Sequence, residues 1–244
     1  KIVLRPWNHC KIVECGEALA SIPKEIICLE PHPYVALGAP YGDFESPWRL
    51  RESVIKKLLK VQEEFEKENF NIRLAVFDAW RPLSVQLFMI NHSIKEECLK
   101  RGVIPHNDND EYKGVLDEVS TFWAPPSSNL LNPPPHSTGG AIDLTLVSFS
   151  GKQLDMGGQI DEIGSISYPD YYEEISLKNK HSSEYLWNSR RKLLNEKMTK
   201  FGFIQHPNEW WHFSYGDQLW AWKTNSDNAI YGRFIPLESN SFTC

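Results

Sequence analysis

The sequence is poor in cysteine and has no long hydrophobic run, and each shortage excludes a class of protein. Its 244 residues hold five cysteines, an odd and sparse set that does not form a dense disulfide framework. No window approaches 18 consecutive apolar residues, so the chain has no membrane-spanning helix. We therefore expect reduced thiols in a cytoplasmic protein without membrane insertion, with the periplasm as the alternative compartment. The cysteines are Cys10, Cys15, Cys28, Cys98 and Cys244.

The sequence also lacks any run of Lys and Arg. Its formal net charge is -6, a poor electrostatic match to a phosphate backbone or an anionic membrane surface. The charge therefore predicts a small or uncharged partner and no nucleic acid. Nothing in the sequence indicates an oligomeric state.

The composition is that of a globular protein with a sizeable core. Hydrophobic residues make up 41% of the chain and aromatic residues 12%, including nine Trp. There is no internal repeat or low-complexity tract, and one Pro-rich stretch, APPSSNLLNPPP at 124–135, interrupts the middle. We expect a single domain spanning residues 1–244 with a long central loop.

Hydrophobic periodicity predicts three long helices. The first begins at Ser46 and Pro47, which are typical of an N-cap and first turn, and ends about 20 residues later near Asn69. The second covers 83–100 and is stopped by Gly102, and the third covers 183–200 before Gly202. The third helix is expected to bury Leu186, Leu193, Leu194 and Phe201.

Alternating residues predict strands between these helices. A strand over 72–77 delivers Asp78, Trp80 and Arg81 at its end. A strand over 141–149 places Ile142, Leu144 and Leu146 on one face, so that Asp143 and Thr145 project from the other. Short aromatic strands are expected at 209–215, 218–222 and 231–235. These elements predict an α+β fold with a small, mostly antiparallel sheet and flanking helices.

The stretch PHSTGGAIDLTL at 135–146 is unusual because a His, two Gly and an Asp lead into a strand. A lone His or Asp most often has a structural role. Here Gly139 and Gly140 permit a tight turn with positive φ, which folds His136 back over the strand toward Asp143. The sequence therefore predicts that His136 and Asp143 converge on one point, where they are candidate metal ligands.

The stretch NEWWHFSY at 208–215 supplies the remaining groups, Glu209 and His212. A catalytic zinc takes three protein ligands and leaves a fourth position for water, and a carboxylate beside that water accepts its proton. Residues three apart in an ideal strand face opposite sides. Pro207 and Asn208 predict a loop, however, so we expect Glu209 at the non-extended first position of the strand and His212 within it.

The sequence leaves two alternatives for metal binding open. His206 competes with His212 as a ligand, and Cys10, Cys15, Cys28 and His32 form a second set of zinc-type residues. The C-x4-C spacing of that set is loose, and KIVEC at 11–15 is typical of a strand. The HExxH helix of common zinc peptidases is absent.

Four sequence blocks together resemble the D-alanyl-D-alanine dipeptidases, the vancomycin-resistance-type branch of the zinc D,D-peptidases that act on peptidoglycan peptides. The blocks occur in the family's order: DAWRP (78–82), HSTGGAIDLTL (136–146), DMGGQID (155–161) and EWWHF (209–213). PHPYVALGAPYG at 31–42 also resembles the family's N-terminal region.

The resemblance implies a zinc D,D-peptidase-like fold and a specific role for each site residue. One zinc per chain is expected on His136, Asp143 and His212, with Glu209 as the general base. By the same resemblance Arg81 stabilises the oxyanion and Asp161 binds the substrate's ammonium group.

The activity implied is hydrolysis of D-Ala-D-Ala by a metal-activated water. Two alternatives stay open: a carboxypeptidase or endopeptidase acting on longer peptidoglycan stems, and a non-catalytic binding protein of the same fold. The presence of Glu209 argues against the binding protein, because a binding module needs no base beside the metal.

One position departs from the family pattern. A Ser often stands two residues before the first His, but here Pro134 occupies that position and Pro135 follows. Two prolines remove a hydroxyl and two backbone donors. We expect zinc binding to be retained and the substrate contacts made by this loop to differ.

Overall fold

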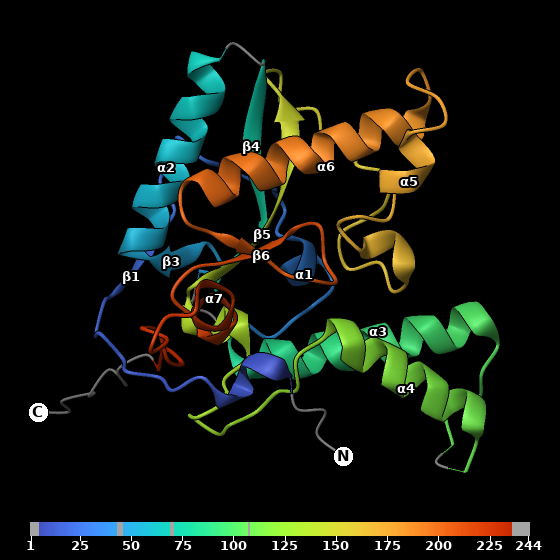
Figure 1. Ribbon diagram of the computed structural model, residues 1–244. Helices are drawn as coiled ribbons and strands as arrows, with labels where there is room; N and C mark the ends of the chain where they lie inside the picture. Colours follow the sequence, from blue (N-terminus) through green and yellow to red (C-terminus); the bar gives the residue numbers. More distant parts are fainter. Residues whose placement is uncertain (1–4, 43–45, 69–70, 107, 236–244) are drawn as a thin grey trace, which may run out of the picture.

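The computed structural model describes residues 5–42, 46–68, 71–106 and 108–235, which build a five-stranded sheet with helices on both sides (Figure 1). The strand order is β2-β4-β5-β7-β6. β2 and β4 are parallel and every other pair is antiparallel, which confirms the predicted mostly antiparallel α+β fold. The strands are β2 (Ile27–Cys28), β4 (Ile72–Asp78), β5 (Ala141–Ser148), β6 (Ile204–Gln205) and β7 (His212–Ser214); β1 (Leu19–Ser21) and β3 (Arg49–Arg51) form a separate pair.

Two long helices, α2 and α6, lie over one side of the sheet, while α3 and α4 lie side by side below it in Figure 1. None of the helices in the described ranges is both long and apolar enough to span a bilayer. The helices are α1 (Pro33–Ala36), α2 (Glu52–Lys67), α3 (Leu83–Arg101), α4 (Asp110–Phe122), α5 (Glu173–Ser176), α6 (Ser183–Lys200) and α7 (Gln218–Thr224). Short 3-10 helices are η1 (Pro6–His9), η2 (Pro135–Thr138) and η3 (Ser165–Ser167).

The main core lies between the sheet and the helices α2 and α6. Ile142, Leu144 and Leu146 of β5 are fully buried there with Leu58 of α2 and Leu194 of α6. The alternation predicted for β5 is therefore confirmed. The opposite face of β5, which carries Asp143 and Thr145, is also buried, so the carboxylate of Asp143 lies inside the protein.

A bulge in β4 aligns polar residues across the sheet. Val76 pairs with Leu144 and Asp78 pairs with Asp143. Between these two pairs β4 advances by two residues while β5 advances by one. The extra residue turns Asp78 onto the face of Asp143. Because Asp143 also pairs with His212 of β7, three neighbouring strands present a row of polar side chains at one point.

Several predicted boundaries and element types are wrong. The first long helix begins at Glu52, because the residues before it form β3 and pair with β1, and the Ser46 hydroxyl accepts a hydrogen bond from the Trp48 N–H instead of capping a helix. The predicted helix end near Asn69 lies outside the described residues. Residues 218–222 form helix α7 rather than a strand, because the Asp217 carboxylate caps it by accepting from the Trp220 N–H at 2.9 Å.

Other differences concern packing and omitted elements. Leu186 is 46% exposed and does not face the core, whereas Leu194 is buried as predicted and Leu193 and Phe201 pack against the core. Residues 231–235 form no strand, and KIVEC contributes a single isolated bridge between Ile12 and Ala229. Helix α4 and the short strands β1, β2, β3 and β6 had no clear signal in the sequence.

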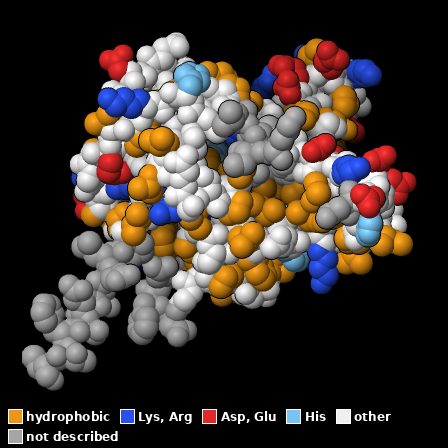
Figure 2. All heavy atoms as spheres, turned by 90° about the horizontal axis from the view of Figure 1, so that it is seen from below, with side chains coloured by type: hydrophobic (Ala, Val, Ile, Leu, Met, Phe, Trp, Pro, Cys, Tyr) orange, Lys and Arg blue, Asp and Glu red, His pale blue; other side chains and the backbone are white. Residues whose placement is uncertain are grey.

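The surface seen from below mixes residue types. In Figure 2 hydrophobic side chains gather over the central part of this face, and the acidic groups lie mostly toward its edges. The Lys and Arg side chains that this view shows among the described residues are scattered rather than gathered in one patch.

Candidate active site

Three predicted ligands, His136, Asp143 and His212, converge at one point of the described structure. They come from η2, β5 and β7, and one ligand atom of each lies within 4.8 Å of the others. His136 Nε2 is 3.2 Å from Asp143 Oδ2 and 3.2 Å from His212 Nδ1, and His212 Nδ1 is 3.2 Å from Asp143 Oδ1. All three side chains are buried.

Two glycines position His136 over the strand. Gly139 ends η2 with φ of 73°, a left-handed conformation that favours glycine. Gly140 has no room for a side chain, because a Cβ there would lie 2.5 Å from the Tyr215 carbonyl oxygen of the neighbouring strand end. The predicted tight turn is thus confirmed, and close backbone approach is the second reason for the glycine pair.

The three residues fit a tetrahedral divalent metal ion. Two ligand atoms bound at about 2.0–2.1 Å from such an ion lie about 3.3 Å apart, close to the separations observed here. Asp143 Oδ1 is buried and accepts no hydrogen bond from the described residues, as expected of an oxygen that binds a metal. The donor set, two imidazoles and one carboxylate, is one that zinc uses in catalytic sites.

Outer contacts fix the orientation of both imidazoles. His136 Nδ1 lies 2.7 Å from the Ala79 carbonyl oxygen, to which it donates, so Nε2 is left to face the metal position. His212 Nε2 lies 3.2 Å from Ser214 Oγ, and the Ser214 hydroxyl donates to Asp217 at 2.7 Å. His212 Nδ1 is thereby left as the ligand atom.

The alternative metal set of cysteines is wrong. Cys10, Cys15 and Cys28 do not cluster with His32 in the described structure; His32 caps α1 and lies 3.2 Å from Asp78. Cys98 is free as well, and Cys244 lies outside the described residues. His206 also lies outside the ligand set.

Glu209 lies in the turn before β7, as Pro207 and Asn208 predict. Its Oε2 is 3.5 Å from His212 Nδ1, and its Oε1 is 3.7 Å from His206 Nδ1. Burial, followed by the charge of Asp143, raises the pKa of Glu209 to about 8. A carboxyl with a raised pKa and a place beside the metal position is suited to accept a proton.

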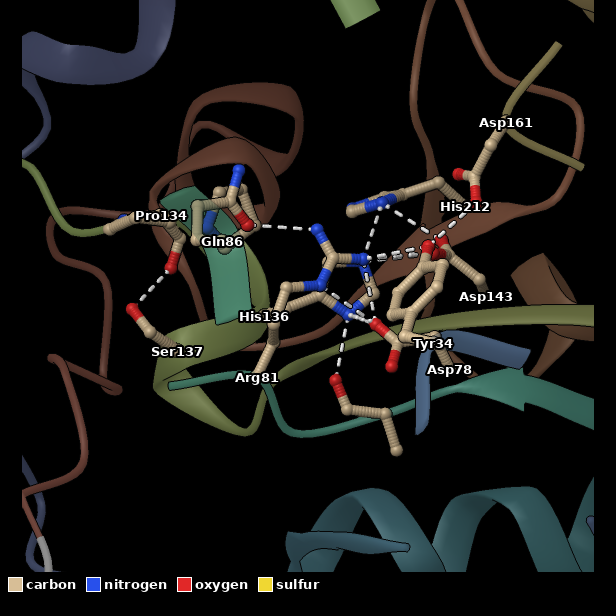
Figure 3. A network of polar contacts seen from close by, with 12 residues as sticks. Tyr34, Asp78, Arg81, Gln86, Pro134, His136, Ser137, Asp143, Asp161 and His212 are labelled. Carbon is tan, nitrogen blue, oxygen red and sulfur yellow. Dashed lines mark hydrogen bonds and ion pairs between the residues drawn. The ribbon is translucent and has the colours of Figure 1, made fainter. Parts of the chain in front are cut away.

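Arg81 is buried and held by a network of acceptors (Figure 3). Its guanidinium donates twice to Asp78, once to Gln86 at 2.8 Å and once to the Tyr34 hydroxyl at 3.3 Å. Nη2 of Arg81 lies 3.5 Å from Asp143 Oδ2. Four of the five guanidinium N–H groups are thus used by described residues, and one on Nη1 is left for a ligand.

Asp161 belongs to the same network. The Tyr34 hydroxyl donates to its Oδ2 at 2.7 Å, and its backbone has φ of 67°. Burial, followed by the charge of Asp143, raises the pKa of Asp161 to about 7. Asp161 is therefore a residue with positive φ whose side chain lines the same pocket as the three ligands.

All six predicted site residues line one pocket. Phe122, Trp123 and Trp211 supply its aromatic walls, and Arg5 lines it from the N-terminal segment. The structure thus brings together the whole predicted site: His136, Asp143, His212, Glu209, Arg81 and Asp161.

Several residues that shape the site were not predicted from the sequence. Asp78 and Tyr34 stand within blocks already singled out, DAWRP and PHPYVALGAPYG, so the family resemblance pointed near them. Ser214 and Asp217 follow His212 closely but form no recognisable motif. Arg5 had no signal, because its contact with His206 joins residues 201 positions apart.

Comparison with known proteins identifies the family. A family model described as D-Ala-D-Ala dipeptidase matches residues 28–230. The chain belongs to this family. A protein of Synechocystis sp. named D-alanyl-D-alanine dipeptidase is 40% identical over 240 residues, which cover 94% of this chain and 97% of that relative. The Escherichia coli protein of the same name is 40% identical over 78 residues, 32% of this chain and 36% of that relative.

Solved structures also resemble this member of the dipeptidase family. One is a vancomycin-resistance D,D-pentapeptidase, VanY, in complex with Zn(II), with a TM-score of 0.44 and 14% identity, covering 75% of this chain and 80% of the other. Family membership makes the protein a metallopeptidase.

The prolines that depart from the family pattern begin η2 in this dipeptidase-family chain. Pro135 occupies the first helical turn, where a missing N–H costs little. The Pro134 carbonyl accepts from the Ser137 N–H at 3.1 Å and from the Ser137 hydroxyl at 2.7 Å. The loop is thus stable without the usual Ser, but it offers no side-chain donor from position 134.

Proposed function

We propose that the protein hydrolyses D-Ala-D-Ala to two D-alanines with one zinc held by His136, Asp143 and His212. The observation that carries the proposal is the place of Glu209, whose Oε2 lies 3.5 Å from a ligand nitrogen although Glu209 is not in the ligand set. A carboxylate so placed serves a reaction rather than binding alone. The name of the Synechocystis relative supports the choice of substrate.

Zinc bound here would polarise the substrate carbonyl and lower the pKa of a water molecule. Glu209 accepts the proton of the attacking water and passes it to the nitrogen of the leaving D-alanine. Its raised pKa, about 8, favours both halves of that transfer near neutral pH. The remaining N–H of Arg81 Nη1 donates to the carbonyl oxygen as negative charge develops on it.

Asp161 determines the length of the substrate in this proposal. A carboxylate at the pocket edge pairs with a free ammonium group, which a dipeptide presents next to the cleaved bond. A longer stem peptide has an uncharged amide at that place, which cannot form this ion pair. We therefore place dipeptides ahead of the longer stems that a carboxypeptidase or endopeptidase would cleave.

The test is hydrolysis of D-Ala-D-Ala, L-Ala-L-Ala and a stem pentapeptide, each with and without a chelator. We expect chelator-sensitive cleavage of D-Ala-D-Ala alone. Cleavage of the pentapeptide without cleavage of the dipeptide would transfer the proposal to a stem-acting peptidase. Absence of cleavage with zinc bound would favour a binding protein.

The remaining expectations stay predictions. They are the single domain over residues 1–244, the cytoplasmic compartment and the absence of a nucleic-acid partner. Cell fractionation tests the compartment, and limited proteolysis tests the domain organisation, because a second domain would yield a separate stable fragment.

A further inference from the structure

Arg5 is a second cation in the wall of the active-site pocket. It lies just before η1 and lines the same pocket as Glu209 and Asp161. Its Nη1 is 3.2 Å from His206 Nε2, and its Nη2 donates to the Ser120 carbonyl oxygen at 3.2 Å. The N-terminal segment thus reaches the pocket from outside the region that the family model matches, residues 28–230.

Arg5 lacks a carboxylate partner among the described residues. Arg81 pairs with Asp78 and Arg51 pairs with Glu14, whereas the fully buried Arg191, like Arg5, has only neutral acceptors among the described residues. Arg5 has neutral acceptors and the ring of Trp7 around it. Burial lowers the pKa of Arg5, and the charge of Glu209 opposes that effect. The half-buried guanidinium of Arg5 is suited to bind an incoming carboxylate.

Two chains of contacts lead away from the metal position and end at opposite charges. One passes from Asp143 to Arg81 and Tyr34 and ends at the carboxylate of Asp161. The other passes from His212 to Glu209 and His206 and ends at the guanidinium of Arg5. A zwitterionic dipeptide carries an ammonium at one end and a carboxylate at the other.

The prolines of the central loop lie beside Arg5. A recess that adjoins the pocket is lined by Arg5 together with Ala124, Pro134 and Pro135. Neither proline has a side-chain donor, and neither has a backbone N–H. Among the described residues that line this recess, Arg5 is the one cation.

We infer that Arg5 is a specificity-determining residue that binds the terminal carboxylate of the substrate. The inference rests on the proposed function, and it adds that both charged ends of the dipeptide are recognised, the ammonium by Asp161 and the carboxylate by Arg5. The guanidinium keeps its contact with Ser120 through Nη2 and turns free N–H groups toward the ligand. Recognition of both ends restricts the enzyme to dipeptides with a free carboxylate.

The alternative is that Arg5 affects catalysis through the general base, Glu209. The positive charge of Arg5 lowers the pKa of Glu209, whereas burial and the charge of Asp143 raise it. Arg5 also contacts His206, whose imidazole lies next to the carboxylate of Glu209. In that case loss of Arg5 would slow the cleavage of every substrate equally. The two roles differ in how the effect depends on the substrate's carboxylate.

The test compares kcat/KM for D-Ala-D-Ala and for its C-terminal amide, D-Ala-D-alaninamide, in the zinc-loaded full chain. Four proteins are needed: the native chain, Arg5→Ala, Arg5→Lys and the control Arg233→Ala. Arg233 also donates to a backbone carbonyl, that of Ser128, but it does not line the pocket. Unfolding temperature and zinc content are measured for each.

We expect Arg5→Ala to lower kcat/KM for the free acid by about 30-fold or more, mainly through KM. The same variant should change kcat/KM for the amide by less than about threefold, so the preference for the acid is lost. Arg5→Lys keeps the charge without the planar fork and should retain an intermediate preference. Arg233→Ala should match the native chain on both substrates.

Equal losses on acid and amide would overturn the inference and assign Arg5 to Glu209 or to the fold. An unchanged preference in Arg5→Ala would overturn it as well. If Arg5→Ala does not fold, the acid preference of Arg5→Lys relative to the native chain decides. A native chain that cleaves neither compound contradicts the proposed function itself, whereas cleavage with equal losses contradicts only the role of Arg5.

Discussion

The carboxylate of Asp78 accepts two hydrogen bonds from the guanidinium of Arg81, from Nε at 3.0 Å and from Nη2 at 2.7 Å. Both groups are buried, and Asp78 also accepts from the Tyr41 hydroxyl at 3.1 Å. The bulge in β4 turns Asp78 to the site face, so the position of Arg81 depends on that bulge. Backbone irregularity and catalytic geometry are directly connected here.

This pairing determines which variant tests Arg81. Arg81→Ala would leave Asp78 buried without its cation, at a cost of about 3–5 kcal/mol of stability. Arg81→Lys keeps the charge, and we expect kcat to fall about 100- to 1,000-fold with a smaller change in KM, because the contact strengthens in the transition state. Steady-state kinetics together with thermal unfolding measure both effects. A change in KM alone would reassign Arg81 to ground-state binding.

Glu209→Ala should separate metal binding from turnover. Because Glu209 is not in the ligand set, the variant should keep about one zinc per chain while kcat falls about 100- to 10,000-fold. Metal analysis of the purified variant and a hydrolysis assay give the two values. The matched control is His136→Ala, which should lose the metal. Zinc loss in Glu209→Ala would contradict the assigned roles.

The pKa of Asp161, about 7, predicts a pH effect on substrate capture. Above this pH the carboxyl is charged and pairs with the ammonium; below it the carboxyl is neutral and the pair is lost. Because kcat/KM reports groups of the free enzyme, its value should decrease as the pH falls from 8 to 6. Asp161→Asn should have a lower kcat/KM than the native chain at pH 8. Its kcat/KM should also decrease less between pH 8 and pH 6, because the variant has no carboxyl group to protonate at position 161. An unchanged profile would assign the decrease to Glu209 instead.

The contact of Ser214 with His212 and Asp217 predicts an effect on metal affinity. Ser214→Ala removes the hydroxyl that faces His212 Nε2, and we expect zinc affinity to fall about 10- to 100-fold with little loss of folding. Competition with a metal-binding dye measures the affinity. Ser189→Ala, on the exposed side of α6, is the control, since its hydroxyl donates to a helix carbonyl. Equal affinities in the two variants would show that Ser214 does not support the ligand.

Much of the site could be predicted because its signals are local. The glycine pair after His136 and the turn before Glu209 each follow from a few adjacent residues, and the structure confirms both turns. The wrong helix start at Ser46 has a different cause, since the pairing of β1 with β3 overrides a local cap signal. For α7, the aromatic residues favour a strand, but the carboxylate of Asp217 caps the first turn and stabilises a helix.

Local signals of this kind do not predict contacts between distant parts of the chain. Asp78 reaches the face of Asp143 because of a register shift that depends on two paired strands. Arg5 reaches His206 because η1 packs against α7 at the other end of the chain. Periodicity and spacing carry no information on either event, since both depend on tertiary packing.

The pairing of Asp143 with His212 in β5 and β7 also bears on how the chain folds. A slip of one residue between these strands would send one of the two ligands to the opposite face of the sheet. Chains with the wrong register therefore have no complete metal site. A metal ion that binds during folding stabilises only the correctly paired sheet. Zinc supply would then govern the yield of native protein as well as its activity.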